Sequence, residues 1–148
     1  MDEELPESGI TAERTFRVEP RHATVLFGEQ TEPPGLPAAA DADPDEAVAV
    51  LGTPQVLAEV EFLGRESLRG RLPEGTGVVG VDAEVTHRRA VPIGESVSVR
   101  TEVTDVTDRT ITVAGELSLA GSGESVGDVR NRLRVVRRAA FADRVPSR

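Results

Sequence analysis

Apolar and polar residues alternate through most of the second half of the chain, a pattern typical of half-buried β-strands. Three stretches, 95–106, 110–121 and 126–138, alternate in this way and are joined by the short polar turns "DR" and "SGES". They predict an antiparallel meander. The stretch "GVVGVDAEVTHRR" (77–89) precedes them, and its alternation predicts one shared face made of Val79, Val81, Ala83, Val85 and His87.

One segment has the helical period instead. Thr53 is a favourable N-cap residue, and Pro54 then takes the first helical position, where its missing N–H costs nothing. Gly70 marks the end, so we expect a helix over about 53–69, the only long helix of the chain. One helix against an antiparallel sheet predicts a two-layer α+β domain. The expected buried face of the helix consists of Val56, Leu57, Val60, Leu63, Gly64, Ser67 and Leu68.

The remaining segments set the expected domain limits. Residues 1–13 are acidic and are predicted to form a disordered tail, followed by one domain over 14–138 with a first strand at 15–20. Residues 28–47 are rich in Pro, Ala and Asp and read as an irregular loop or lid, which in a compact domain is often functional. Residues 139–148 are expected to form a C-terminal tail.

Composition narrows the function classes. The chain has 148 residues, a net charge of −9 and no Cys, which excludes disulfides, thiolate metal sites and a Cys nucleophile. A nucleic-acid partner is not expected for so acidic a protein, and no apolar run is long enough to span a membrane. A cytoplasmic protein is the default. All 17 basic residues are Arg, a bias that a GC-rich genome and adaptation to high salt both produce.

One cluster of basic residues interrupts the acidic background. It has two readings, a phosphate-binding site or a solvated strand face that offsets the acidic remainder. The cluster consists of Arg130, Arg132, Arg134, Arg137 and Arg138.

Three polar residues lie where chemistry is possible. His87 shares the predicted core face but ends its strand beside a Pro-x-Gly turn, so it is either a structural core histidine or a proton-transfer group. Glu61 borders the apolar helix face, which suits either a solvated flank or a functional carboxylate. Thr53 has the simple role of an N-cap, whatever else it does.

The segments "VLGTPQVLAEVE", "TGVVGVDAEVTHRRAVPIGESVSV" and "SVGDVRNRLRVV" resemble the fluoroacetyl-CoA thioesterase family, which has the hot-dog fold. In that family a Thr opens the central helix, a Glu follows eight residues later and a His lies 26 residues beyond it. Thr53, Glu61 and His87 match these spacings. The resemblance covers about residues 15–138, including "VEPRHATV" and Arg132, and implies that Gly80 lines the acyl pocket.

The resemblance implies an acyl-CoA thioesterase without a cofactor or metal, whose catalytic set is Thr53, Glu61 and His87. Glu61 would attack the thioester carbonyl or activate water, and His87 would relay protons. Arg88 and Arg89 are candidates for contacts with CoA phosphates, and solvated positions suit them equally. The lid lacks the bulky aromatics of the fluoroacetyl enzyme, so a different acyl group is expected.

One distance bears on how the catalytic set is assembled. Thr53 and Glu61 are separated along the helix by about 12 Å at 1.5 Å per residue, so their side chains are not expected to meet within one chain. Either Thr53 acts on another part of the substrate or a homodimer supplies it from the partner subunit. Hot-dog domains of this kind pair as dimers with the site at the interface. The amides of Gln55 and Val56 are the expected oxyanion donors.

Two other functions remain open at this stage. A non-catalytic hot-dog module could bind acyl-CoA as a sensor or carrier, but binding alone does not require all three polar positions. A hot-dog hydratase is less favoured, because nothing in the chain resembles the Asp-and-His segment of that family.

Overall fold

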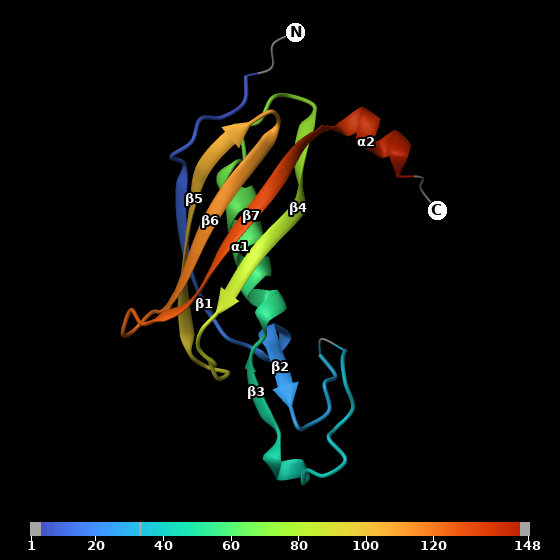
Figure 1. Cartoon of the computed structure of the whole chain (residues 1–148), viewed down its shortest axis with the longest axis vertical. Coiled ribbons are helices and arrows are strands. Elements are labelled where there is room, and N and C mark those ends of the chain that lie inside the picture. The colour runs from blue at the N-terminus through green and yellow to red at the C-terminus, as the bar shows by residue number, and fades with distance from the viewer. Residues whose placement is uncertain (1–3, 33, 146–148) are drawn as a thin grey trace.

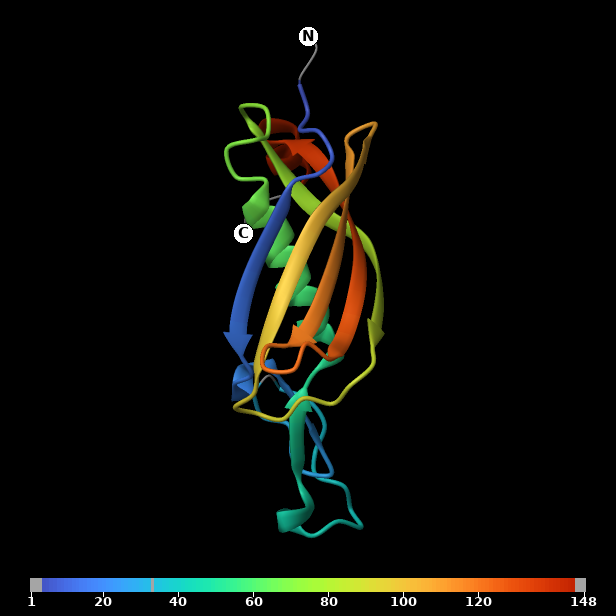
Figure 2. The ribbon, with the colours of Figure 1, turned by 90° about the vertical axis from the view of Figure 1, so that its left-hand side faces the viewer.

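A five-stranded antiparallel sheet curves around one long helix, as Figures 1 and 2 show. The computed structural model describes residues 4–32 and 34–145. The expected meander is confirmed, since Ser96–Thr107 (β5), Thr110–Leu119 (β6) and Ser125–Arg137 (β7) pair in sequence. Thr11–Arg17 (β1) adds to β5 and Thr76–His87 (β4) adds to β7, so the strand order is β1-β5-β6-β7-β4 with β4 at one edge.

The helix α1 spans Thr53–Ser67 and packs its predicted apolar face on the sheet. Two details differ from the prediction. Gly52, not Thr53, is the N-cap residue, so the Thr53 hydroxyl is not used for capping. The buried face also includes a charged residue that the predicted apolar face does not contain, Glu59, which pairs with Arg14 of β1 at 3.5 Å. The helix and sheet approach closely where a Cβ on Gly115 would meet Val60.

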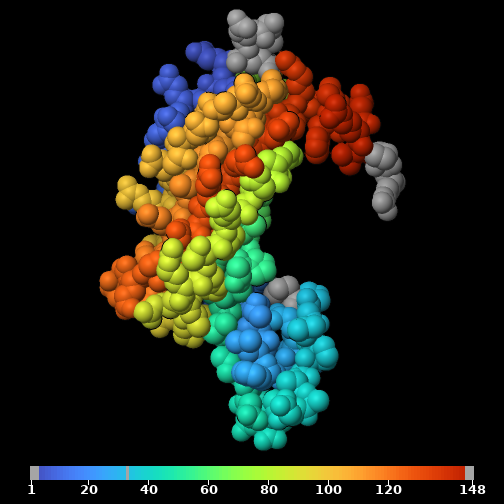
Figure 3. Space-filling view, viewed as in Figure 1, coloured from blue at the N-terminus to red at the C-terminus, as the bar shows by residue number. Residues whose placement is uncertain are grey.

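A two-stranded arm extends from the body beyond the N-terminus of the helix (Figures 1 and 3). Its strands are Ala23–Leu26 (β2) and Val48–Leu51 (β3), which pair antiparallel. The described part of the segment between them contains an isolated bridge between Thr31 and Pro34 and a short 3₁₀ turn, Pro44–Glu46. The region predicted to be irregular is therefore a long loop closed at its base by two strands that the sequence pattern did not indicate.

Strand β4 contains a β-bulge that corrects the predicted face. Its register with β7 shifts between Gly80 and Asp82, leaving Val81 as the extra residue. Gly80 pairs with the buried Leu133, so it faces the helix, whereas Val79 pairs with the exposed Arg134 and faces away. The expectation that Val79 shares a face with His87 is wrong, and Val81 has no partner on β7. Beyond the bulge Ala83, Val85 and His87 do face the helix, because they pair with Asn131, Val129 and Gly127, which are buried.

The two ends of the domain also depart from the predicted limits. Strand β1 begins at Thr11, so residues 11–13 belong to the sheet and not to a disordered tail, and residues 1–3 lie outside the described residues. At the other end a short helix, Arg138–Arg144 (α2), replaces part of the expected C-terminal tail. A short 3₁₀ turn, Pro20–His22 (η1), follows β1. Within residues 4–32 and 34–145, no helix has the length and apolar character to cross a membrane.

Candidate active site

Thr53 and His87 meet at the N-terminus of α1. The Thr53 Oγ1 atom lies 2.9 Å from His87 Nδ1, in hydrogen-bond contact. This contact is possible because Gly52 caps the helix and leaves the Thr53 hydroxyl uncommitted. The other ring nitrogen, His87 Nε2, is buried and has no hydrogen-bond partner among the described residues. The structure thus brings together, within one chain, two of the three residues that the sequence indicated.

Glu61 occupies a second position on the same side of the sheet. Its carboxylate lies directly against Gly80, where a Cβ would be 3.0 Å from Glu61 Cδ and would overlap Oε1. Glycine at this position is therefore needed for the carboxylate to sit on the strand. Glu61 is half-buried and forms no hydrogen bond or ion pair with the described part of the chain. A carboxylate in this state is available to a ligand.

The two pairs of residues do not join into one site within a chain. Glu61 lies two helical turns from Thr53, and Gly80 and His87 are separated by seven residues of β4. The prediction that Thr53 and Glu61 do not meet in one chain agrees with this geometry. The partner of Thr53 is instead His87 of the same chain.

The sequence profile of the fluoroacetyl-CoA-specific thioesterases matches residues 37–139. The chain belongs to this family. It is accordingly a thioester hydrolase. Comparison of the sequence with curated proteins finds no match.

Solved structures agree with this assignment at the level of the fold. A variant of the fluoroacetyl-CoA-specific thioesterase is 21% identical, with a TM-score of 0.75 and 96% of each chain covered. The same variant in complex with fluoroacetate and CoA is 22% identical with a TM-score of 0.71, covering 90% of this chain and 97% of that one. A hot-dog-like protein from Thermanaerovibrio acidaminovorans is 19% identical, with a TM-score of 0.72, covering 97% and 96%. The predicted hot-dog fold is confirmed.

The thioesterase has a buried polar residue beside the β4 bulge that was not predicted as a site residue. Asn131 of β7 is buried on the helix-facing side, and its Nδ2 donates to the backbone carbonyl of Asp82 at 3.1 Å. This bond satisfies a carbonyl at the β4 bulge. The strand pattern of β7 gave one signal, since Asn131 is a polar residue at an inward position between Val129 and Leu133.

His22 supports the helix N-terminus of the thioesterase from the other side. Its Nδ1 accepts a hydrogen bond from the Glu19 amide at 2.9 Å, and its carbonyl accepts one from the Gly52 amide at 2.9 Å. Burial and the nearby Arg21 cation lower the pKa of His22 below 6.5, while Glu59 and Glu19 act in the opposite direction. His22 therefore holds the residue that precedes Thr53 in place. The lowered pKa also favours the neutral form of the His22 imidazole.

Arg88 and Arg89 are both committed to carboxylates. Arg88 forms a bidentate ion pair with Asp128, with hydrogen bonds of 2.6 and 3.1 Å, and Arg89 pairs with Glu124. The hydrogen bonds from Arg88 lower the pKa of the Asp128 carboxyl. A CoA phosphate would have to displace these partners, so the structure offers no open phosphate site at this pair.

The expected oxyanion donors are also committed. The amides of Gln55 and Val56 both donate to the Gly52 carbonyl, at 3.0 and 3.1 Å, which corrects their assignment. The amide of Thr53 is the first of the helix and has no intrahelical acceptor. Within the described ranges, no group of three or more His, Asp or Glu side chains is placed to hold a metal ion.

Proposed function

We propose that this thioesterase hydrolyses acyl-CoA with Thr53, Glu61 and His87 as its catalytic set. The observation that carries the proposal is the Thr53–His87 hydrogen bond of 2.9 Å, which orients an imidazole whose Nε2 is buried without a described partner. The uncommitted carboxylate of Glu61 supplies a nucleophile or base. CoA in the related thioesterase structure supports this substrate class. We expect an acyl group other than fluoroacetyl, because the 28–47 segment differs from the lid of that enzyme.

The chemistry follows from these groups. Glu61 either attacks the thioester carbonyl to form an anhydride or removes a proton from an attacking water. The carbonyl oxygen becomes an oxyanion, for which the Thr53 amide at the positive end of α1 is the backbone donor. The C–S bond then breaks, and His87 delivers a proton to the thiolate to give free CoA. In the anhydride route, water next cleaves the anhydride to the free acid and the Glu61 carboxylate, and the proton lost by that water returns to His87. In the general-base route, the proton that Glu61 takes from water returns to His87. Water and the CoA thioester are the only reactants in this scheme, so no resident cofactor is required.

A second copy of the chain would complete the site. Strand β4 has twelve residues, forms one edge of the sheet, and is exposed over residues 80–84. A long open edge of this kind is a template for pairing. Figure 3 shows the molecule hollowed along β4, between the β2–β3 arm and α2. Because Ala83 and Glu84 lie midway between Gly80 and His87, antiparallel pairing of two β4 strands about that point sets Glu61 of one chain beside His87 of the partner subunit.

A thiol-release assay tests the activity. Short, branched, long and aryl acyl-CoAs are supplied to the wild type, to Glu61→Gln and to His87→Ala, at low and at molar salt. The chain has no Cys and adds no thiol background. We expect hydrolysis of at least one substrate and a strong loss in both variants. Wild-type rates in both variants would overturn the catalytic assignment, and binding without turnover would favour a sensor or carrier.

Mixing the two inactive variants tests the shared site. In a mixed dimer, the site that combines Glu61 of the His87→Ala chain with His87 of the Glu61→Gln chain is intact. Random exchange makes half of the dimers mixed, so activity returns to about a quarter of the wild-type value. No recovery is expected if each site is built within one chain. Hydroxylamine, which traps an anhydride at Glu61 but leaves a general base unmodified, separates the two roles of that residue.

A further inference from the structure

A groove lined by four arginines lies where β7 passes into α2. Its volume is about 380 Å³, and its walls include Arg109, Arg134, Arg137 and Arg144 together with Ala140 and Phe141. The residues that line it include no Asp or Glu. The structure therefore divides the arginine cluster seen in the sequence, because Arg134 and Arg137 join this groove while Arg130 and Arg132 lie further down β7.

Elsewhere on this sheet face, three arginines form ion pairs with carboxylates. Arg132 pairs with Asp82, Arg88 with Asp128, and Arg100 with Glu13 at 3.6 Å. Arg130 lies across from Glu84 in the strand register.

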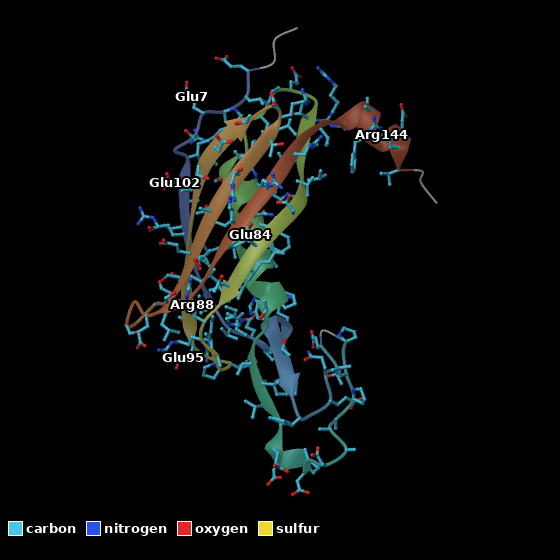
Figure 4. All side chains as sticks on the ribbon, in the orientation of Figure 1. Glu7, Glu84, Arg88, Glu95, Glu102 and Arg144 are labelled. Carbon is cyan, nitrogen blue, oxygen red and sulfur yellow. The ribbon has the colours of Figure 1, made fainter. Side chains whose placement is uncertain are left out.

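Arg134 differs from these arginines, because its cross-strand neighbours are the uncharged Val79 and Thr110. In the described part of the chain, neither Arg134 nor Arg144 forms an ion pair. Figure 4 labels Arg144 on α2 and Arg88 toward the other end of the sheet, which separates the two regions. A concentration of positive charge in a protein of net charge −9 indicates an anion site.

The chemistry of the walls specifies the anion. Guanidinium groups match phosphate and carboxylate oxygens alike in bidentate geometry, so the aromatic wall of the groove is what distinguishes one anion from another. Phe141 is 40% exposed and offers an aromatic face on which a planar base can stack. We propose that this groove binds a phosphate-bearing nucleotide. The further assignment to the nucleotide end of CoA rests on the proposed acyl-CoA function.

The position of the groove fits that assignment. Val136 lines the groove and pairs with Gly77 of β4. Gly77 is three residues from Gly80, which corresponds to about 10 Å along the strand. Arg134 projects from the outward face of the sheet, whereas the Glu61 carboxylate lies on the helix-facing side. A pantetheine arm that connects them would pass around the edge of β4 at residues 76–79, which lie beyond the part of β4 that pairs with the partner subunit in the proposed dimer.

Calorimetric titration of the full chain with CoA, ADP and pantetheine tests the site. The test variant is Arg134→Gln with Arg144→Gln, and the matched control is Arg100→Gln, an exposed strand arginine on the same sheet face. Because hydrogen bonds to charged groups are the strong ones, the double variant should bind CoA and ADP more weakly by about tenfold or more. Pantetheine binding and the control should match the wild type, and the melting temperature should not change.

Kinetics then identify the source of the nucleotide. If CoA uses the groove, the double variant raises KM for acyl-CoA and leaves kcat, and the hydrolysis of acyl-pantetheine, unchanged. If ADP binding weakens but KM for acyl-CoA does not, the groove is a site for a free nucleotide. Unchanged affinity for both CoA and ADP in the double variant overturns the proposal. Failure of the proposed function has a different signature, since wild type would then hydrolyse neither acyl-CoA nor acyl-pantetheine.

Discussion

Replacing Gly80 by Ala tests whether the place of the Glu61 carboxylate, and not merely its presence, determines activity. A Cβ on Gly80 would overlap Glu61 Oε1, and the next nearest atoms also belong to that carboxylate. No backbone atom or buried apolar side chain is among these nearest atoms. The methyl group therefore acts selectively on the end of one flexible side chain.

The size of the effect can be worked from this geometry. To regain an ordinary van der Waals separation the carboxylate must retreat by about 1 Å, and a displacement of that size is sufficient to lower a rate by about 100-fold. The effect on stability is expected to be small. Moving Glu61 off its rotamer costs about 0.5–1.5 kcal/mol. Replacing Gly by Ala stabilises the folded state by about 0.4–1 kcal/mol, because it reduces the conformational entropy of the unfolded chain.

The assay compares Gly80→Ala with Gly77→Ala on the same strand. A Cβ on Gly77 would have no neighbouring atom within 4 Å, so that change should leave both rate and melting temperature at wild-type values. We expect kcat of Gly80→Ala to fall by about two orders of magnitude while its melting temperature stays within a few degrees. Full activity in Gly80→Ala, with folding intact, would refute the role of the Glu61–Gly80 contact. Equal losses in both variants would instead indicate a general sensitivity of β4.

Three other changes have distinct expected outcomes. Thr53→Val should lower kcat by about tenfold or more, because the hydrogen bond to His87 is lost. It should not lower the stability by the ~1 kcal/mol that removal of an N-cap side chain costs, whereas Thr53→Ser should retain activity. Rate measurements and thermal melts of both variants check these expectations. Because the pKa of His22 is lowered on folding, its neutral form contributes its full share to the free energy of unfolding above pH 6.5, and this share is lost as the pH falls below that value. Asn cannot titrate, so the free energy of unfolding of His22→Asn, measured with urea, should fall less steeply with decreasing pH than that of the wild type. Gly115→Ala should destabilise the fold by about 1–3 kcal/mol, because its Cβ would press on the branched, buried Val60; an unchanged urea midpoint would contradict this.

The helix and the meander could be predicted because their signals are local. The apolar spacing from Val56 to Leu68 and the alternation in β5, β6 and β7 are properties of adjacent residues. The N-cap was assigned one residue late, because Thr53 has the stronger capping preference and yet Gly52 holds the position. That choice depends on long-range contacts, in which the Gly52 amide bonds to His22 and the Thr53 hydroxyl bonds to His87.

The candidate site was predictable in its members but not in their pairing. Spacing and resemblance singled out Thr53, Glu61 and His87, yet no spacing shows that Thr53 pairs with His87 while Glu61 rests on Gly80. The buried Glu59 was also unpredictable, because its partner Arg14 lies on a strand far away in the sequence. Such pairs depend on how strands are ordered in the sheet.

The bulge in β4 explains how one strand serves both halves of the site. Gly80 and His87 are seven residues apart, an odd number, so in a regular strand they would point to opposite faces of the sheet. The extra residue at Val81 reverses the parity, and both then face α1. Asn131 secures the arrangement from the neighbouring strand through its bond to the Asp82 carbonyl. The bulge is therefore a condition for the proposed catalytic geometry. Without it, either the glycine that contacts Glu61 or the histidine that bonds to Thr53 would lie on the other side of the sheet.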